Sequence, residues 1–162
     1  MVNEGDLAPD FTLLSDAGES VTLSSLRGRP VVLYFYPKDN TSGCTTQACG
    51  IRDAWGEFER AGAAVLGVSP DGVDSHVKFK NDFELPFTLL ADPDHGVAEA
   101  YGVWQEKSRQ GRTHFGIVRS TFVIDPEGTV VTAIRRVDPA THADDVLAVL
   151  AGSAAGHGSA RS

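Results

Sequence analysis

The two cysteines of the chain, Cys44 and Cys49, lie five residues apart at the end of one short stretch. They follow a strongly apolar run, residues 31–36, and the loop before Cys44 has Pro37 at one end and Gly43 at the other. A thiol reacts as its thiolate, and an ordinary thiol, with a pKa of about 8.5, is mostly protonated at neutral pH. A reactive cysteine at this position therefore needs neighbouring groups that favour the thiolate.

The elements around Cys44 supply such groups. Apolar residues recur at spacings of three and four from Ala48 to Phe58, which predicts an amphipathic helix from about Ser42 to Ala61. Cys44 lies in its first turn, where unpaired backbone N–H groups and the positive end of the helix dipole favour an anion. The hydroxyl of Thr41 is placed to donate to the sulfur or to a bound oxygen. We therefore interpret Cys44 as an attacking thiol.

Cys49 is interpreted as the resolving thiol. On an intact helix the Cα atoms of residues i and i+5 are roughly 8.6 Å apart, whereas a disulfide tolerates at most about 7 Å. The two cysteines can therefore bond only if the first turns unwind, and Gly50, Thr45 and Thr46 weaken the helix there. A disulfide that requires local unfolding is readily reduced, so it belongs to a reaction cycle.

The remaining pattern predicts an α/β fold with a central mixed sheet flanked by helices. Residues 31–36 and 63–69 are expected to be buried strands joined by the helix in a right-handed crossover. The other expected elements are an N-terminal hairpin (11–14 and 20–23), a helix (73–83), a strand (87–90), a short helix (94–101), a loop or lid (106–116), a second hairpin (121–124 and 129–133) and a last helix (143–150) capped by Thr141. We expect one domain, residues 1–150, and a flexible tail, residues 151–162.

The composition excludes several partners. A net charge of -8 and only scattered basic residues argue against nucleic acid and anionic membranes. No apolar run approaches the roughly 18 residues of a membrane helix, and the start of the chain lacks the pattern of an export signal. We therefore expect a cytoplasmic protein, in which a cysteine pair is rarely a structural disulfide.

The sequence Pro37-x-x-x-Thr41-x-x-Cys44, which follows an aromatic strand, resembles the peroxidatic motif of the peroxiredoxins. The run from Gly43 to Cys49 and the segment 102–108 resemble the bacterioferritin comigratory protein branch of that family, also called PrxQ. The similarity covers nearly the whole chain.

The resemblance implies a thioredoxin-like fold with peroxiredoxin additions. It also implies thiol-dependent reduction of hydrogen peroxide and organic hydroperoxides, without a cofactor or a metal. Cys44 would be oxidised to a sulfenic acid, Cys49 would condense with it, and a thioredoxin-type donor would reduce the disulfide. Thr41 would orient the peroxide, Pro37 would shield the sulfur from water, and Arg119 would stabilise the thiolate and the leaving oxygen. Since the branch is often monomeric, we expect a monomer or at most a weak dimer.

Two other functions stay open for a reactive cysteine pair. One is a thioredoxin-type disulfide reductase, although that chemistry normally uses the C-x-x-C spacing. The other is a redox-sensing or chaperone-like module that oxidises the same cysteine without rapid turnover. Metal binding is disfavoured by the cysteine spacing and by the distant histidines. We interpret all five histidines as surface or core residues: His76, His95, His114, His142 and His157.

Overall fold

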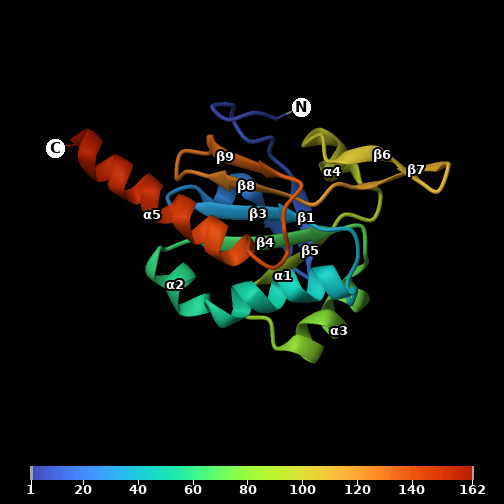
Figure 1. Cartoon of the computed structure of the whole chain (residues 1–162). Helices are drawn as coiled ribbons and strands as arrows, with labels where there is room; N and C mark the ends of the chain where they lie inside the picture. Colours follow the sequence, from blue (N-terminus) through green and yellow to red (C-terminus); the bar gives the residue numbers. More distant parts are fainter. Residues whose placement is uncertain (1, 162) are drawn as a thin grey trace.

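The computed structural model describes residues 2–161, without the side chains of residues 109 and 153–161. A seven-stranded sheet in the order β2-β1-β5-β4-β3-β8-β9 crosses the molecule, and helices cover it (Figure 1). Its strands are β1 (Thr12–Ser15), β2 (Ser20–Thr22), β3 (Val31–Phe35), β4 (Ala64–Ser69), β5 (Thr88–Ala91), β8 (Ser120–Ile124) and β9 (Val130–Arg135). The helices are η1 (Leu23–Leu26), α1 (Ser42–Asp53), α2 (Trp55–Arg60), α3 (Val73–Phe83), α4 (Gly96–Ala100) and α5 (His142–Arg161).

The central strand β3 is buried along its whole length, as its β-branched and aromatic sequence predicts. It pairs parallel with β4 and antiparallel with β8, so the sheet is mixed. Helix α1 follows β3 and precedes β4, which confirms the predicted crossover unit. The predicted N-terminal hairpin is also confirmed, because β1 and β2 pair antiparallel. The α/β fold class is therefore correct.

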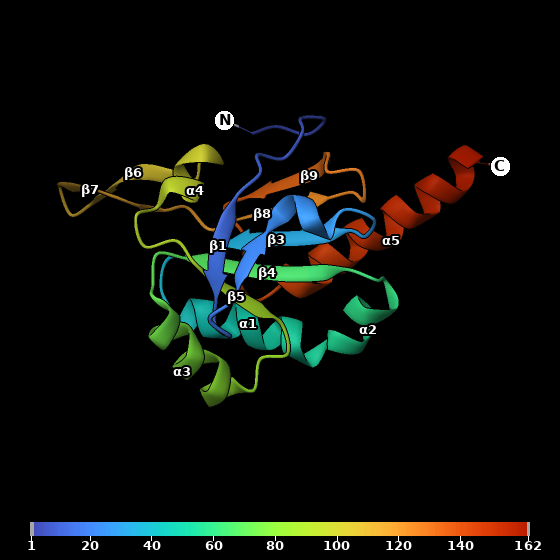
Figure 2. The same ribbon diagram turned by 180° about the vertical axis from the view of Figure 1, so that it is seen from behind.

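Alternate residues of β3 feed two cores, one on each face of the sheet. Val32 and Tyr34 pack with the apolar residues of α1, α3 and α5. Leu33 and Phe35 pack on the other face with residues of α4, η1 and the N-terminal segment. The view from behind shows α4 and the N-terminal segment (Figure 2). This two-sided burial makes β3 a central strand, and the chain continues from its carboxyl end to the start of α1.

Two predicted elements differ from the structure. The helix expected over 42–61 is interrupted at Ala54, whose backbone (φ -102°, ψ 15°) separates α1 from α2. The loop expected over 106–116 is instead a hairpin of β6 (Trp104–Arg109) and β7 (Arg112–Ile117). Gln110 and Gly111 make its two-residue turn, and both have the positive φ that such turns require. This ribbon is polar because much of β7 is exposed, so the sequence carries no apolar alternation there.

The last helix is longer than expected. Thr141 precedes it, and its hydroxyl donates a hydrogen bond to Asp145 Oδ2 (2.9 Å), which differs from the predicted cap, in which the hydroxyl accepts from a backbone N–H of the first turn. The helix continues to Arg161 rather than ending at Leu150, and it extends past the sheet (Figures 1 and 2). One domain over 1–150 and a flexible tail over 151–162 stay predictions, and Ser162 lies outside the described residues. No helix in the described chain is long and apolar enough to span a membrane.

Candidate active site

Cys44 lies in the first turn of α1, as predicted, and only 1% of its surface is exposed. Thr41 precedes the helix in an extended conformation (φ -86°, ψ 155°), so the backbone N–H groups of the first turn are directed toward this end of α1. Cys49 lies on the same helix and is partly exposed, and both thiols are free. The helix is therefore intact while both cysteines are free thiols. This agrees with the geometry of a helical i, i+5 pair, whose Cα atoms are too far apart for a disulfide.

Arg119 reaches Cys44 because of the register of the sheet. Strand β8 pairs with β3 so that Ser120 lies opposite Phe35, which places Arg119 beside the end of β3. Its Nη1 donates to Cys44 Sγ at 3.3 Å. A Cβ atom at position 43 would lie 3.1 Å from Arg119 Nη2, so Gly43 leaves the space that the guanidinium occupies. The structure thus brings together two candidate residues that are distant in sequence.

Gln47 is a buried partner of Arg119 that the sequence reasoning missed. The same Nη1 of Arg119 donates to Gln47 Oε1 at 2.7 Å. The signal was present, because residues three apart on a helix lie on one face, and Gln47 is three residues after Cys44. A buried glutamine in the first turns of a helix needs such partners for its amide.

His142 satisfies the other end of the Gln47 amide. Since Gln47 Oε1 accepts from Arg119, its Nε2 donates to His142 Nδ1 (3.2 Å). The opposite ring nitrogen, Nε2, then carries the proton and donates to Thr121 Oγ1 (2.7 Å). Burial lowers the pKa of His142 to about 4, so the ring is neutral at pH 7, as this arrangement requires. Of the two predicted locations for His142, surface or core, the structure shows the core.

Thr41 and Pro37 belong to the loop between β3 and α1. The Thr41 hydroxyl donates to the Lys38 carbonyl at 2.9 Å, whereas the sequence suggested donation to the sulfur. Because its proton is used in this way, Thr41 Oγ1 has its lone pairs left and can act only as an acceptor toward another group. Pro37 is partly buried next to the end of β3.

A second buried network holds the same loop. The carboxylate of Asp39 accepts hydrogen bonds from the Tyr36 hydroxyl (2.6 Å), the Ser75 hydroxyl (2.8 Å) and His76 Nδ1 (2.7 Å). The other ring nitrogen of His76 donates to the Leu90 carbonyl at 2.9 Å. Burial raises the pKa of Tyr36 well above its usual value, which keeps this hydroxyl a donor. The loop that leads to Cys44 is therefore anchored to α3 and β5.

A cavity of about 470 Å³ lies beside Arg119, between the start of β8, the end of β9 and strand β6. Two further basic residues, Lys107 and Arg136, and one acidic residue, Glu106, also line it. Burial lowers the pKa of Lys107, and the charges of Arg119 and Arg136 contribute to the shift. This side of the candidate site is therefore cationic, although the chain as a whole carries a net charge of -8.

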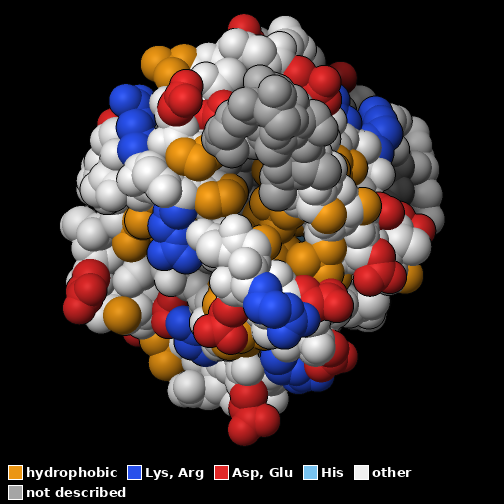
Figure 3. Space-filling view, turned by 90° about the vertical axis from the view of Figure 1, so that its left-hand side faces the viewer, with side chains coloured by type: hydrophobic (Ala, Val, Ile, Leu, Met, Phe, Trp, Pro, Cys, Tyr) orange, Lys and Arg blue, Asp and Glu red, His pale blue; other side chains and the backbone are white. Residues whose placement is uncertain are grey.

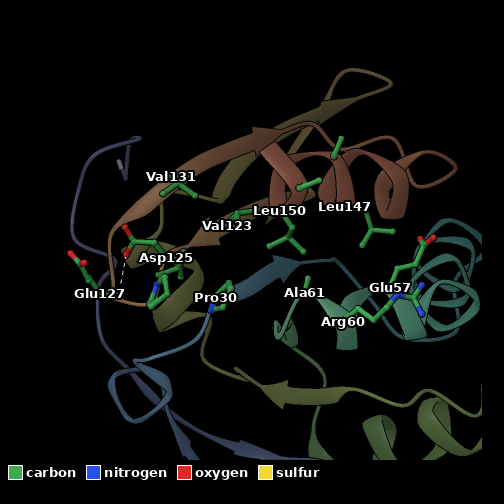
Figure 4. Close-up of a pocket in the computed structure, with 14 residues that line it drawn as sticks. Pro30, Glu57, Arg60, Ala61, Val123, Asp125, Glu127, Val131, Leu147 and Leu150 are labelled. Atoms are coloured by element: carbon green, nitrogen blue, oxygen red, sulfur yellow. Dashed lines mark hydrogen bonds between the residues drawn. The ribbon is translucent and has the colours of Figure 1, made fainter. Parts of the chain in front are cut away.

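A larger groove of about 790 Å³ lies elsewhere, between α2, α5 and the sheet. Apolar side chains gather in this hollow, as Figure 3 shows. Figure 4 shows Val123, Leu147 and Leu150 among its lining residues. Neither cysteine nor Arg119 lines the groove, so its volume does not contribute to the cysteine site.

A buried thiol at a helix N-terminus, in contact with a guanidinium at the edge of a mixed α/β sheet, defines a thiol-based redox enzyme of thioredoxin-like fold. Comparison with known proteins agrees with this class. The AhpC/TSA family matches residues 5–133 of the chain. The chain therefore belongs to the AhpC/TSA family.

The relatives narrow the branch of the family. Peroxiredoxin Bcp of Bacillus subtilis is 47% identical over 146 residues, which cover 90% of this chain and 93% of that protein. The Escherichia coli K12 protein of the same name is 46% identical over 143 residues, covering 88% and 92%. These matches confirm the resemblance to the peroxiredoxins of the bacterioferritin comigratory branch.

Solved structures confirm the thioredoxin-like fold with peroxiredoxin additions. The bacterioferritin comigratory protein of Xanthomonas campestris has a TM-score of 0.85 at 43% identity, covering 89% of this chain and 92% of that one. A mutant of Xylella fastidiosa PrxQ has a TM-score of 0.89 at 37% identity, covering 95% and 98%.

Proposed function

We propose that this protein is a thiol-dependent peroxidase that reduces hydrogen peroxide and organic hydroperoxides. The observation that carries the proposal is the contact of 3.3 Å between Arg119 Nη1 and the buried sulfur of Cys44 at the start of α1. The similarity to peroxiredoxins of two bacteria supports it. So does the similarity to the Xanthomonas campestris protein, whose structures concern its alkyl peroxide reduction activity.

In the first step the thiolate of Cys44 attacks one peroxide oxygen. The S–O bond forms as the O–O bond breaks, and the leaving oxygen takes up a proton as water or an alcohol, leaving a sulfenic acid. The charge of Arg119 stabilises the negative charge that develops on the leaving oxygen. Thr41 accepts a hydrogen bond from the peroxide O–H, because its own proton is donated to Lys38. Pro37 shields the sulfur from bulk water.

In the second step the thiol of Cys49 condenses with the sulfenic acid. The S–S bond forms and water leaves. Both cysteines lie on α1, and a helical i, i+5 pair is roughly 8.6 Å apart between Cα atoms, so the first turns of α1 unwind before the bond forms. A thioredoxin-type dithiol then reduces the disulfide and becomes oxidised itself. Helix α1 thus has two opposed roles. The intact helix favours the thiolate of Cys44, whereas the unwound helix permits the disulfide with Cys49.

The surroundings of this reaction are also part of the proposal. We expect a monomer, or at most a weak dimer, in the cytoplasm. The net charge of -8 supports the absence of nucleic-acid and anionic-membrane partners. The cavity beside Arg119 supplies positive charge next to the guanidinium that contacts Cys44.

The experiment follows peroxide consumption with thioredoxin, thioredoxin reductase and NADPH. We expect turnover in the wild type, none in Cys44→Ser, and a single equivalent of peroxide consumed by Cys49→Ser without thioredoxin-linked turnover. If peroxide does not oxidise Cys44 in the wild type, the peroxidase assignment is wrong. Oxidation of Cys44 without turnover would instead favour the redox-sensing or chaperone-like module. Peroxide-independent reduction of insulin disulfides would favour the thioredoxin-type reductase.

A further inference from the structure

The start of α5 packs against the part of α1 that lies between the two cysteines. Gln47 donates to His142 across this contact. One helical turn further along, a Cβ atom at position 50 would lie 3.7 Å from Ala143 Cβ, which is van der Waals distance, so the two helices are in contact there as well. Figure 1 shows α5 beside α1 at this place. The first residues of α5 therefore cover the segment that has to unwind before the disulfide forms.

Unwinding this segment separates buried hydrogen-bonded groups. Gln47 lies between Cys44 and Cys49, so it moves when these turns of α1 open. Its amide then leaves both Arg119 Nη1 and His142 Nδ1. Gln47 and His142 are fully buried, and a buried polar group that loses its partner is unfavourable. The amide of Gln47 thus opposes unwinding, provided that its partners stay fixed.

His142 is fixed independently of α1. Its Nε2 donates to Thr121 Oγ1 on β8, the strand that also follows Arg119. The ring packs against Tyr34 on the central strand, with the ring centroids 5.5 Å apart. The sheet therefore holds the imidazole in place, and the imidazole presents its acceptor nitrogen to α1.

We propose that His142 is a positioning residue that stabilises the folded first turns of α1. Through Gln47 it keeps Arg119 against Cys44 for the attack on the peroxide, and it opposes the unwinding that lets Cys49 reach the sulfenic acid. The consequence for turnover rests on the proposed peroxidase function. His142 lengthens the life of the sulfenic acid and so exposes it to a second peroxide, which would oxidise it to the sulfinic acid.

Two substitutions at one position separate the two bonds of His142. His142→Asn retains an acceptor where Nδ1 faces Gln47 and loses the bond to Thr121. His142→Gln retains a polar group near Thr121 and withdraws the acceptor from Gln47. If His142 only fills space in the core, the two variants behave alike, whereas a role through Gln47 makes them differ.

The first measurement is amide hydrogen exchange of the reduced protein, which involves no peroxide chemistry. Protection of residues 45–50, divided by the protection of β3 and β4, separates local opening from a global loss of stability. We expect His142→Gln to lower this ratio about tenfold, the size of effect that one buried hydrogen bond has. His142→Asn should stay within about threefold of the wild type.

The second measurement follows the sulfenic acid by mass spectrometry after one equivalent of peroxide. We expect His142→Gln to form the disulfide several-fold faster and to accumulate less sulfinic acid at high peroxide, with His142→Asn close to the wild type. A ratio in His142→Gln equal to that of the wild type, or an equal loss in both variants, would overturn the proposal. If hydrogen exchange differs between the two variants as expected, but peroxide does not oxidise Cys44 in the wild type, the positioning role stands and the peroxidase function is rejected.

Discussion

Arg119 uses one nitrogen, Nη1, for two neighbours: the sulfur of Cys44 at 3.3 Å and the amide oxygen of Gln47 at 2.7 Å. The bond to Gln47 fixes the guanidinium plane, and the fixed plane directs the charge toward the sulfur. An ammonium group carries the same charge, but it is a compact point charge on a flexible stem and lacks the rigid plane that the bond to Gln47 orients. The orientation of the charge, as well as its sign, should therefore matter for the peroxide step.

This leads to a graded prediction for Arg119. We expect Arg119→Ala to slow the reaction of reduced protein with hydrogen peroxide by about 100-fold, the loss typical of removing one fixed donor to a developing charge. Arg119→Lys should recover only part of this rate. Competition kinetics give the second-order rate constant. Arg112→Ala removes an equal charge from the exposed face of β7 and serves as the control; an effect as large there would assign the loss to net charge alone.

At the level of elements, the loop before Cys44 is held by a buried hydrogen-bond network. Asp39 and His76 have side chains that are 1% and 0% exposed, with 2.7 Å between Oδ2 and Nδ1. Both ring nitrogens of His76 face acceptors, the carboxylate and the Leu90 carbonyl. The backbone N–H of Asp39 also donates to Asp71 at 2.7 Å. Removing one member therefore leaves an uncompensated buried group.

The second prediction concerns this pair. His76→Ala should lower the free energy of unfolding by roughly 3–5 kcal/mol, because the Asp39 carboxylate stays buried without its imidazole partner. Asp39→Ala should cost a similar amount. Urea unfolding of both single variants and the double variant measures the coupling between them. Effects that add to within about 0.5 kcal/mol would mean that the two side chains do not act as a pair.

The local pattern predicted those elements whose residues are buried on a regular face. The strands β3 and β4 and the start of α1 follow directly from apolar runs and helical spacing. The hairpin β6–β7 did not follow from the pattern. The first four residues of β7, Phe115 among them, are exposed, so no buried face imposes an alternation of apolar and polar residues. The interruption of the long helix at Ala54 is likewise invisible to a pattern that continues across it.

At the level of the molecule, sheet order decides which distant residues meet at the site. The central position of β3, between β4 and β8, brings Arg119 to Cys44 and His142 to Gln47. The resemblance to a known family pointed to Arg119, whereas spacing alone could not. Gln47 and His142 were missed because a hydrogen bond between residues so far apart in the sequence depends on the packing of α5 against α1. The bond of Thr41 to Lys38 depends on loop geometry that no pattern specifies.

The depressed pKa of His142 makes the stability of the whole molecule depend on pH. The unfolded chain has a histidine pKa of about 6.5, whereas burial lowers that of His142 to about 4 in the folded protein. Between these values the unfolded state binds more protons, so stability is fully present above pH 6.5 and falls as the pH drops toward 4. The full contribution is roughly 3 kcal/mol.

Urea unfolding of the wild type and of His142→Asn between pH 7.5 and pH 4.5 isolates this contribution, because the groups that the two proteins share cancel in the difference. We expect the stability advantage of the wild type to shrink steadily below pH 6.5 and to be nearly constant above it. His114→Gln is the matched control, because it removes one imidazole from the exposed part of β7. A difference between the wild type and His142→Asn that does not change with pH would show that the imidazole is not held neutral by burial.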